Sequence, residues 1–209
     1  MTNIFENIDA KNKYKLLRSF RADTYNFDKN VNITNTVIDS NTICLITKGS
    51  IKIIRNNENG SNNIFDKLEE NEIFGSTPYN LNESDYDVVT IEETQIIIIN
   101  YNDIVKYRGK NKYYNDFIKN LFMIYNDKIK SMNERISIIS KKSIRNKLLE
   151  FFNLSFKKNS SRNIYLPYSY LGLADYLCID RSAMSRELKN LKDEGFIRIT
   201  GKRITLLYK

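Results

Sequence analysis

Cationic and hydroxyl side chains share one face of a short segment near the end of the sequence. When residues 181–192 are placed on a helix, Met184, Leu188 and Leu191 fall on one side. The other side carries the guanidinium, ammonium and hydroxyl groups of Arg181, Ser182, Ser185, Arg186 and Lys189. Such groups donate hydrogen bonds to phosphates and to base edges, and a helix fits the major groove of DNA. The spacing therefore predicts a helix that binds DNA.

A preceding helix and a turn must hold this segment in place. The preceding helix is expected to start at Ser169, which is a good N-cap residue and also one of the predicted DNA contacts. Its inward face is predicted from apolar residues spaced by three: Leu171, Ala174 and Leu177. Residues 178–180 break the pattern, Asp180 is suited to cap the second helix, and Gly195 is suited to end it. Residues 168–192 are thus predicted to form a helix-turn-helix.

Two short β segments follow the second helix. Residues 196–200 and 203–207 alternate loosely around Gly201, which predicts a two-stranded hairpin. Lys202 and Arg203 lie at its turn, where cations suit DNA phosphates. A helix-turn-helix followed by a hairpin is a winged helix. The alternative is a winged helix that binds a partner protein while the rest of the chain is structural.

The charges of the chain are divided unevenly between its two halves. Of the 209 residues, the first 108 hold 12 Lys and Arg against 16 Asp and Glu, and the remainder hold 21 against 9. The basic half contains the predicted winged helix, as expected for a domain that binds nucleic acid.

Nothing in the sequence predicts a membrane or secreted protein. No apolar run is long enough to cross a bilayer, and the first ten residues are polar and acidic, unlike a signal peptide. Two cysteines make no disulfide framework, so we expect a cytoplasmic protein.

A long helix is predicted for residues 113–140, with shorter helices at residues 102–106 and 141–156. Apolar positions of the long helix recur at steps of three and four, which approximates a heptad repeat. The predicted dimer seam consists of Ile118, Leu121, Tyr125, Ile129, Met132, Ile136 and Ile139. Such a stripe is longer than one small domain can cover, so we expect two copies of the chain to pair along it. The alternative is a helix that packs only on its own β domain.

Short β-rich runs separated by Asn, Asp and Gly follow a helix expected at residues 3–20. The expected strands are residues 31–33, 36–38, 42–47, 50–55, 63–67, 88–91 and 95–100. Short strands with frequent turns, including a hairpin signal at residues 57–60, favour an antiparallel β-roll. The predicted fold class is α+β, with a β-roll sensor-like domain at residues 1–110, a dimerisation helix at 111–140 and a winged helix-turn-helix domain at 141–209.

The run LADYLCIDRSAMSRELKNLKDEGFI, residues 173–197, resembles the DNA-binding domain of the Crp/Fnr transcription regulators. The predicted order of β-roll, long helix and basic C-terminal domain is similar to the same family, whose β-roll is a cyclic-nucleotide-binding-like jelly roll. The resemblance implies a homodimer joined along the long helix and a roughly palindromic operator in double-stranded DNA. It also implies contact with RNA polymerase if the regulator is an activator.

The same resemblance implies roles for individual side chains of the second helix. The position that matches Arg181 approaches a guanine, and those that match Ser182, Ser185 and Arg186 contact bases or nearby phosphates. Lys189, Lys202 and Arg203 are expected to hold phosphates. Cyclic-AMP-binding members carry Glu where this sequence has Ser182, so the preferred base there should differ.

A cyclic nucleotide is disfavoured as the ligand of the β-roll. Family members that bind one use a Gly-Glu-Leu step followed by an Arg, and the matching segment here is residues 72–79. Gly75 is present, but Ser76 and Thr77 replace Glu and Leu, and the Arg is missing. No Lys or Arg lies between residues 67 and 106. The carboxylates in that interval, Glu69, Glu70, Glu72, Glu83, Asp85, Asp87, Glu92, Glu93 and Asp103, would repel a phosphate.

The metal-binding side chains of the sequence bear on two further cofactors, an iron–sulfur cluster and haem. An iron–sulfur cluster is disfavoured because four thiolates are the usual set and the chain has only Cys44 and Cys178. Haem stays open, but the sequence has no His, so Cys44, a Met or a Tyr would have to bind the iron. Cys44 is expected in the apolar core, and Cys178 is expected to pack in the turn before the second helix. No metal site is predicted.

The absence of His removes the commonest general base, so no enzyme is predicted. The expected function is a homodimeric, sequence-specific DNA-binding transcription regulator that does not use cyclic nucleotide. Apart from the protein-interaction module, two alternatives stay open. One is a regulator that senses an unidentified small molecule or a gas bound to haem, and the other is a ligand-free regulator controlled by its abundance.

Overall fold

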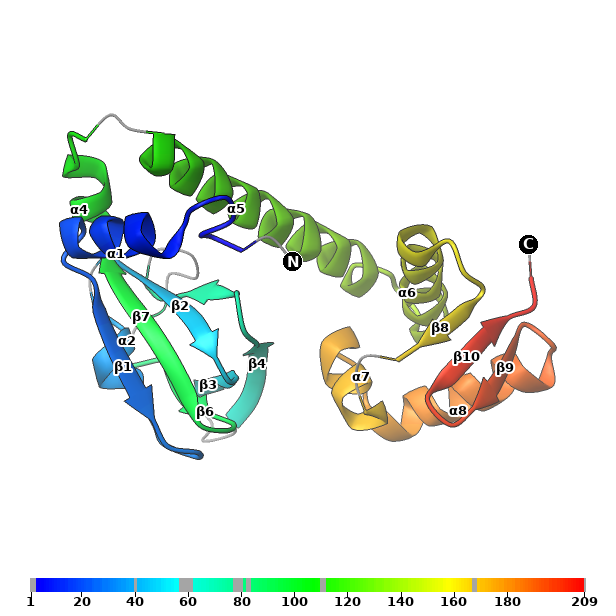
Figure 1. Ribbon diagram of the computed structural model, residues 1–209. Coiled ribbons are helices and arrows are strands. Elements are labelled where there is room, and N and C mark those ends of the chain that lie inside the picture. The colour runs from blue at the N-terminus through cyan, green and yellow to red at the C-terminus, as the bar shows by residue number, and fades with distance from the viewer. Residues whose placement is uncertain are drawn as a thin grey trace. The chain divides into compact units, whose positions relative to one another are not determined.

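The computed structural model describes residues 3–39, 41–56, 62–76, 81, 84–109, 112–166 and 169–208, with backbone alone at residues 62 and 63. The chain divides into two compact units, Met1–Asp127 and Lys128–Lys209, and the division falls inside one long helix (Figure 1). The three-part division predicted from the sequence treats that helix as a segment of its own and stays a prediction.

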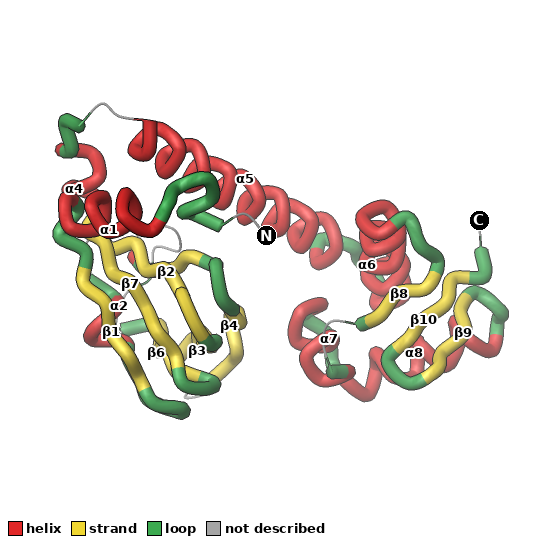
Figure 2. The backbone as a smooth tube through the Cα atoms, in the orientation of Figure 1, coloured by secondary structure: helices red, strands yellow, loops and turns green. Residues whose placement is uncertain are grey.

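Two antiparallel sheets form the β-roll of the first unit (Figure 2). The first has the order β1-β7-β2-β5, with strands Asp23–Phe27, Thr94–Asn100, Thr42–Lys48 and Ile73–Phe74. The second has the order β4-β3-β6, with strands Asn62–Leu68, Ile51–Asn56 and Tyr86–Thr90. Side chains of both sheets meet in one core, which includes Ile46 of β2, Ile53 of β3 and Val88 of β6. The predicted antiparallel β-roll is confirmed.

Strand β2 is buried on both of its faces, which explains its unbroken apolar sequence. Successive side chains of a strand point to opposite faces. Cys44 and Ile46 accordingly enter the core between the sheets, while Ile43 and Leu45 enter a second core under the helices. Strand β7 repeats this arrangement, because a sheet covered on both sides needs continuous apolar runs.

Helices close the second core. The contributing helices are α1 (Ala10–Ser19), α4 (Tyr101–Lys106) and α5 (Lys112–Ile139). Helix α1 starts later than the predicted residue 3, because the Asp9 carboxylate caps it by accepting the backbone N–H of Asn12 at 2.9 Å. Helix α5 agrees with the predicted residues 113–140 to within one residue at each end.

Two predicted strands are wrong. Residues 36–38 belong to or directly follow the short helix α2 (Thr34–Val37), and the Asn32 side chain just before it accepts the Thr34 N–H at 3.0 Å. Residues 31–33 make only an isolated bridge, from Asn32 to Val89. Strands β1 and β5 were not predicted, since β1 is a mostly exposed edge strand and β5 has two residues. The hairpin turn expected at residues 57–60 lies outside the described residues.

The second unit is a winged helix. Its elements are α6 (Ile144–Asn159), β8 (Asn163–Tyr165), α7 (Tyr170–Leu177), α8 (Arg181–Asp193), β9 (Ile197–Thr200) and β10 (Arg203–Leu206). The predicted hairpin is present as β9 and β10, and β8 adds a third strand in the order β8-β10-β9. Gly195 and Gly201 have φ values of +79° and +59°, as a helix end and a tight hairpin require. One core joins all six elements to Ile138 at the end of α5.

The predicted inward face of α7 needs one correction. Ala174 and Leu177 are buried, but Leu171 is 52% exposed and Leu173 is buried instead. A spacing of three drifts by about 60° per step around a helix of 3.6 residues per turn, so a row of three such residues leaves the buried face. Within the described ranges, every helix is too short or too polar to cross a membrane.

Candidate nucleic-acid interface

Helix α8 has one buried and one exposed side, as predicted. Met184, Leu188 and Leu191 are at most 3% exposed and pack into the core of the second unit. The opposite side presents to solvent the side chains of Arg181, Ser182, Ser185, Arg186 and Lys189. Asp180 caps the helix by accepting the Ala183 N–H at 2.8 Å. That these exposed side chains contact DNA stays a prediction.

The turn between β9 and β10 and the start of α7 are joined by a hydrogen bond. The Tyr170 hydroxyl, from the first residue of α7, donates to the carbonyl of Gly201 at 2.9 Å. The neighbouring Ser169 caps α7, and its Oγ accepts the Gly172 N–H at 3.0 Å. We call the β9–β10 hairpin with its turn the wing. Tyr170 was missed from sequence, because nothing in its spacing marks a bond 31 residues away.

One further exposed cation of the wing, Arg198, was also missed. Arg203 is exposed at the start of β10, as predicted, and Arg198 of β9 is exposed as well. Arg198 pairs in register with Thr205 on the neighbouring strand. Alternation along β9 would have revealed Arg198, since Ile197 before it is buried and side chains alternate between faces.

The two cysteines have opposite environments. Cys44 is completely buried between the sheets, as predicted, and burial raises the pKa of its thiol. Cys178 is exposed, so the prediction that it packs is wrong. It ends α7 in the left-handed conformation, with φ +52°, and this turns its side chain away from the core.

An apolar stripe on α5 remains exposed in the single chain. Ile129, Met132 and Ile136 of the predicted seam are 54%, 51% and 56% exposed. Leu121 packs against the core under the helices, as do the partly buried Ile118 and Tyr125, while the neighbouring Phe122, absent from the predicted seam, is 66% exposed. With Phe122 in place of Leu121, the spacing of apolar residues from Ile118 onward alternates regularly between four and three, as in a heptad repeat. With Leu121, two steps of four follow each other. We call Ile118, Phe122, Tyr125, Ile129, Met132, Ile136 and Ile139 the α5 stripe.

Residues 72–79 match the phosphate cassette, which is the Gly-Glu-Leu step and following Arg of cyclic-nucleotide binders, and Gly75 and Ser76 of this segment make close contacts within the β unit. Gly75 has φ +120°, and a Cβ there would lie 2.7 Å from the carbonyl oxygen of Thr42. The Ser76 hydroxyl accepts the Thr42 N–H at 2.9 Å and donates to the Asp39 carbonyl at 2.5 Å. Gly75 is therefore required for close approach to β2, whatever the ligand. Residues 77–79 lie outside the described part of the chain.

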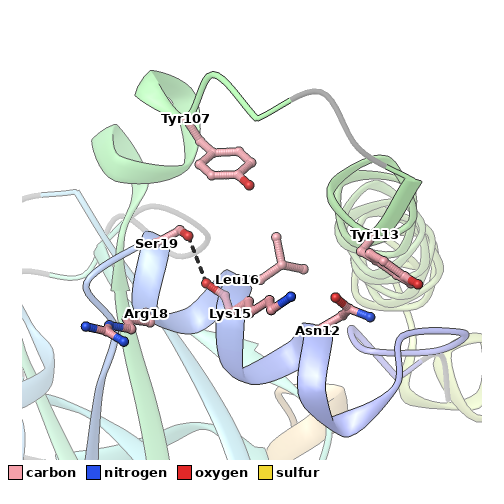
Figure 3. Close-up of a pocket in the computed structure, with 7 residues that line it drawn as sticks. All are labelled: Asn12, Lys15, Leu16, Arg18, Ser19, Tyr107 and Tyr113. Carbon is pink, nitrogen blue, oxygen red and sulfur yellow. Dashed lines mark hydrogen bonds between the residues drawn. The ribbon is translucent and has the colours of Figure 1, made fainter.

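One hollow in the first unit has cations on its wall (Figure 3). It measures about 380 Å³ and is lined by Asn12, Lys15, Leu16, Arg18, Ser19, Tyr107 and Tyr113. Figure 3 shows Lys15 extending toward Asn12 while Arg18 points away from the two tyrosines. The two cations do not converge on one point, so the hollow has no built anion site. Among the described residues, no group of three or more His, Cys, Asp and Glu side chains could hold a metal ion.

Two family models match the chain in the order that the fold presents. The cyclic nucleotide-binding domain model matches residues 37–111, and the Crp-like helix-turn-helix domain model matches residues 146–208. Together the matched segments cover well over half of the sequence. No curated protein sequence matches the chain significantly.

Solved structures share the fold at low sequence identity. CprK complexed with OCPA is 16% identical, with a TM-score of 0.71 and coverage of 93% of this chain and 91% of that chain. A mutant of CooA from Carboxydothermus hydrogenoformans is 16% identical, with a TM-score of 0.67 and coverage of 99% and 92%. The c-di-GMP responsive regulator CLP from Xanthomonas campestris is 15% identical, with a TM-score of 0.59 and coverage of 96% and 100%. With both domain models matched in order and a β-roll, a long helix and a winged helix in place, this chain belongs to the Crp/Fnr family of transcription regulators.

Proposed function

We propose that the protein is a homodimeric, sequence-specific DNA-binding regulator that does not respond to cyclic nucleotides. The observation that carries this proposal is helix α8. It presents two arginines, two serines and a lysine to solvent while its apolar side anchors it in the core. The Arg and Lys side chains suit phosphates and guanine, and the hydroxyls suit either base edges or phosphates.

The surroundings of α8 support DNA as the partner. The second half of the chain holds 21 Lys and Arg against 9 Asp and Glu. Cations also lie at the wing, where Lys202 and Arg203 are exposed. A basic surface that extends beyond the helix itself is what backbone contacts to a duplex require.

The α5 stripe supports a homodimer. Four of its members, Phe122, Ile129, Met132 and Ile136, are more than half exposed in the single chain. An isolated soluble helix gains little from such a row, whereas two copies packed along it would remove the apolar side chains from water. A two-fold dimer would present two copies of α8 to a roughly palindromic operator.

The β-roll supports a signal other than a cyclic nucleotide. Ser76 stands where cyclic-nucleotide binders carry Glu, and its hydroxyl is engaged by Thr42 and Asp39. The sequence from residue 68 to residue 105 offers no cation to a phosphate. CprK is complexed with OCPA and CLP is described as c-di-GMP responsive, so the shared fold alone assigns no signal to this chain.

The test is selection of bound sequences from random double-stranded DNA with the purified protein. We expect a roughly palindromic consensus and a mobility shift with the selected duplex that a scrambled duplex does not compete away. Selection that yields no enriched sequence would overturn sequence-specific binding and would favour a winged helix that contacts protein.

A further inference from the structure

Helix α6 holds both helices of the helix-turn-helix through two cations in its first turn. The Lys147 ammonium donates to the carbonyls of Leu177 and Cys178, at 3.2 Å and 3.4 Å. These carbonyls end α7, where a positive charge is favourable. Arg145 reaches α8 instead, and its contacts are the more specific of the two.

The Arg145 guanidinium joins two carboxylates, one from α8 and one from the residue that caps the end of α8. Its Nε donates to Glu187 Oε1 at 2.6 Å, and its Nη1 and Nη2 donate to the two oxygens of Glu194 at 2.9 Å and 2.5 Å. Glu187 and Glu194 are seven residues apart, so they lie on the same flank of the helix, two turns from each other. The hydrogen bonds that Arg145 donates to Glu194 and Glu187 raise the pKa of Arg145, and the bonds that Glu194 accepts from Arg145 lower the pKa of Glu194.

Apolar packing sets which side of α8 faces the core, but it contributes no directional bond. Met184, Leu188 and Leu191 decide which side faces the core, but hydrophobic contact is non-directional. A bidentate guanidinium–carboxylate pair is directional, and a lysine cannot reproduce its fork. Two points of attachment along one flank therefore fix both the rotation of α8 about its axis and its position along that axis.

The charge of the same flank also matters for a helix in a groove. The major groove is about 12 Å wide and a helix with its side chains is about 10–12 Å in diameter, so each flank lies beside a phosphate backbone. Two uncompensated carboxylates there would repel the duplex. Arg145 supplies the positive charge against them.

We propose that Arg145 is a positioning residue for DNA recognition, which aligns α8 through Glu187 and Glu194 and neutralises that flank. This inference rests on the proposed DNA-binding function. It assigns a role in reading sequence to a residue that lies on another helix and is not expected to touch a base.

The test compares the affinity for the selected operator with that for scrambled DNA in four full-length proteins. They are the wild type, Arg145→Gln, the triple variant Arg145→Gln with Glu187→Gln and Glu194→Gln, and Lys142→Gln. Lys142 is an exposed cation three residues away, so its variant removes the same charge without the fork. Thermal unfolding of each protein establishes that it is folded before binding is measured.

Arg145→Gln should lower operator affinity by about tenfold at low salt and lower the ratio of operator to scrambled affinity. The triple variant should recover affinity for scrambled DNA, because the repelling charges are gone, but not the ratio, because α8 is still unattached. Lys142→Gln should leave the ratio unchanged. A residue that only stabilised the fold would change the melting temperature and leave the ratio of the folded protein as it was.

Two results would overturn the inference: a wild-type ratio in folded Arg145→Gln, or full recovery of the ratio in the triple variant. If Arg145→Gln does not fold, Arg145→Lys replaces it. Arg145→Lys keeps the positive charge but lacks the bidentate guanidinium. A wild-type ratio of operator to scrambled affinity in that variant would also overturn the inference. A wild-type protein that does not discriminate the operator at all would instead refute the proposed function.

Discussion

The β unit and the winged-helix unit of this chain differ in how they could receive an anion. On the winged helix, exposed Lys and Arg side chains lie along α8 and on the wing. In the β unit, the segment that corresponds to a phosphate cassette has no cation, and Ser76 is bonded to its own backbone neighbours. The two units have nonetheless both kept the fold of their family. Apolar patterning preserves a fold, whereas a binding site depends on a few polar side chains that can be lost without it.

The largest effect is expected at the α5 stripe, where two copies of the chain are proposed to pair and so bring two winged helices to one duplex. Ile129→Glu or Met132→Glu would place an unpaired carboxylate in the dimer interface twice, at a cost of several kcal/mol. We expect monomers in sedimentation experiments and a loss of operator affinity of at least about a hundredfold.

Ser131→Glu is the matched control for these two variants. It adds the same charge to the same helix at an exposed position away from the α5 stripe. A dimer that persists in Ile129→Glu and Met132→Glu, with operator affinity intact, would remove α5 as the interface. Leu121→Glu is unsuitable, because Leu121 packs into the core under the helices.

The next largest effect is expected for Arg181, which we expect to contact a base, in contrast to the wing residues that we expect to contact phosphates. Arg181→Ala removes a side chain that suits the O6 and N7 atoms of guanine, and such a pair discriminates by about 1–3 kcal/mol. Operator affinity should fall by about ten- to a hundredfold, while affinity for scrambled DNA changes little. Equal losses on both duplexes in an electrophoretic or fluorescence titration would show that Arg181 does not read a base.

A smaller and different effect is expected at the wing. Lys202→Ala should weaken operator and scrambled DNA alike, because a phosphate contact carries no sequence information. The slope of log affinity against log salt concentration should decrease by about one. The measurement is a salt series on both duplexes, and a change in the operator alone would contradict the assignment.

The smallest effect is expected at the β unit. Calorimetric titration with cyclic AMP or cyclic GMP should give no saturable heat, because residues 68–105 contain no Lys or Arg to hold the phosphate. Saturable binding at micromolar concentration would mean that backbone amides alone hold the ligand, and it would abolish the contrast between the two units.

Long periodic segments were predicted well from the sequence, and short ones were not. The bounds of α5 and the caps Ser169 and Asp180 followed from spacing and from side chains that bond to nearby backbone groups. Residues 36–38 were wrongly predicted as a strand, because a run of three β-branched residues fits a strand and a short helix equally. Strand β1 was missed because an exposed edge strand has no buried alternation to reveal it.

The candidate site shows the same limit for contacts that are distant in sequence. The exposed face of α8 follows from residues three to five positions apart, so it was visible before the fold was known. The bond from Tyr170 to Gly201 and the fork from Arg145 to Glu187 and Glu194 join elements that only tertiary packing brings together. That Leu121 packs inward while Phe122 is exposed has the same cause. Which of two neighbouring apolar residues faces the β unit depends on how that unit meets the helix.

The unequal burial of the two thiols gives this chain a native site for labelling. Cys44 is sealed between the sheets and its pKa is raised, so it stays a protonated thiol that reagents do not reach. Cys178 is exposed in the turn three residues before α8 begins. A maleimide dye should therefore attach at one position without any substitution. Its fluorescence would report from beside the recognition helix when a duplex arrives.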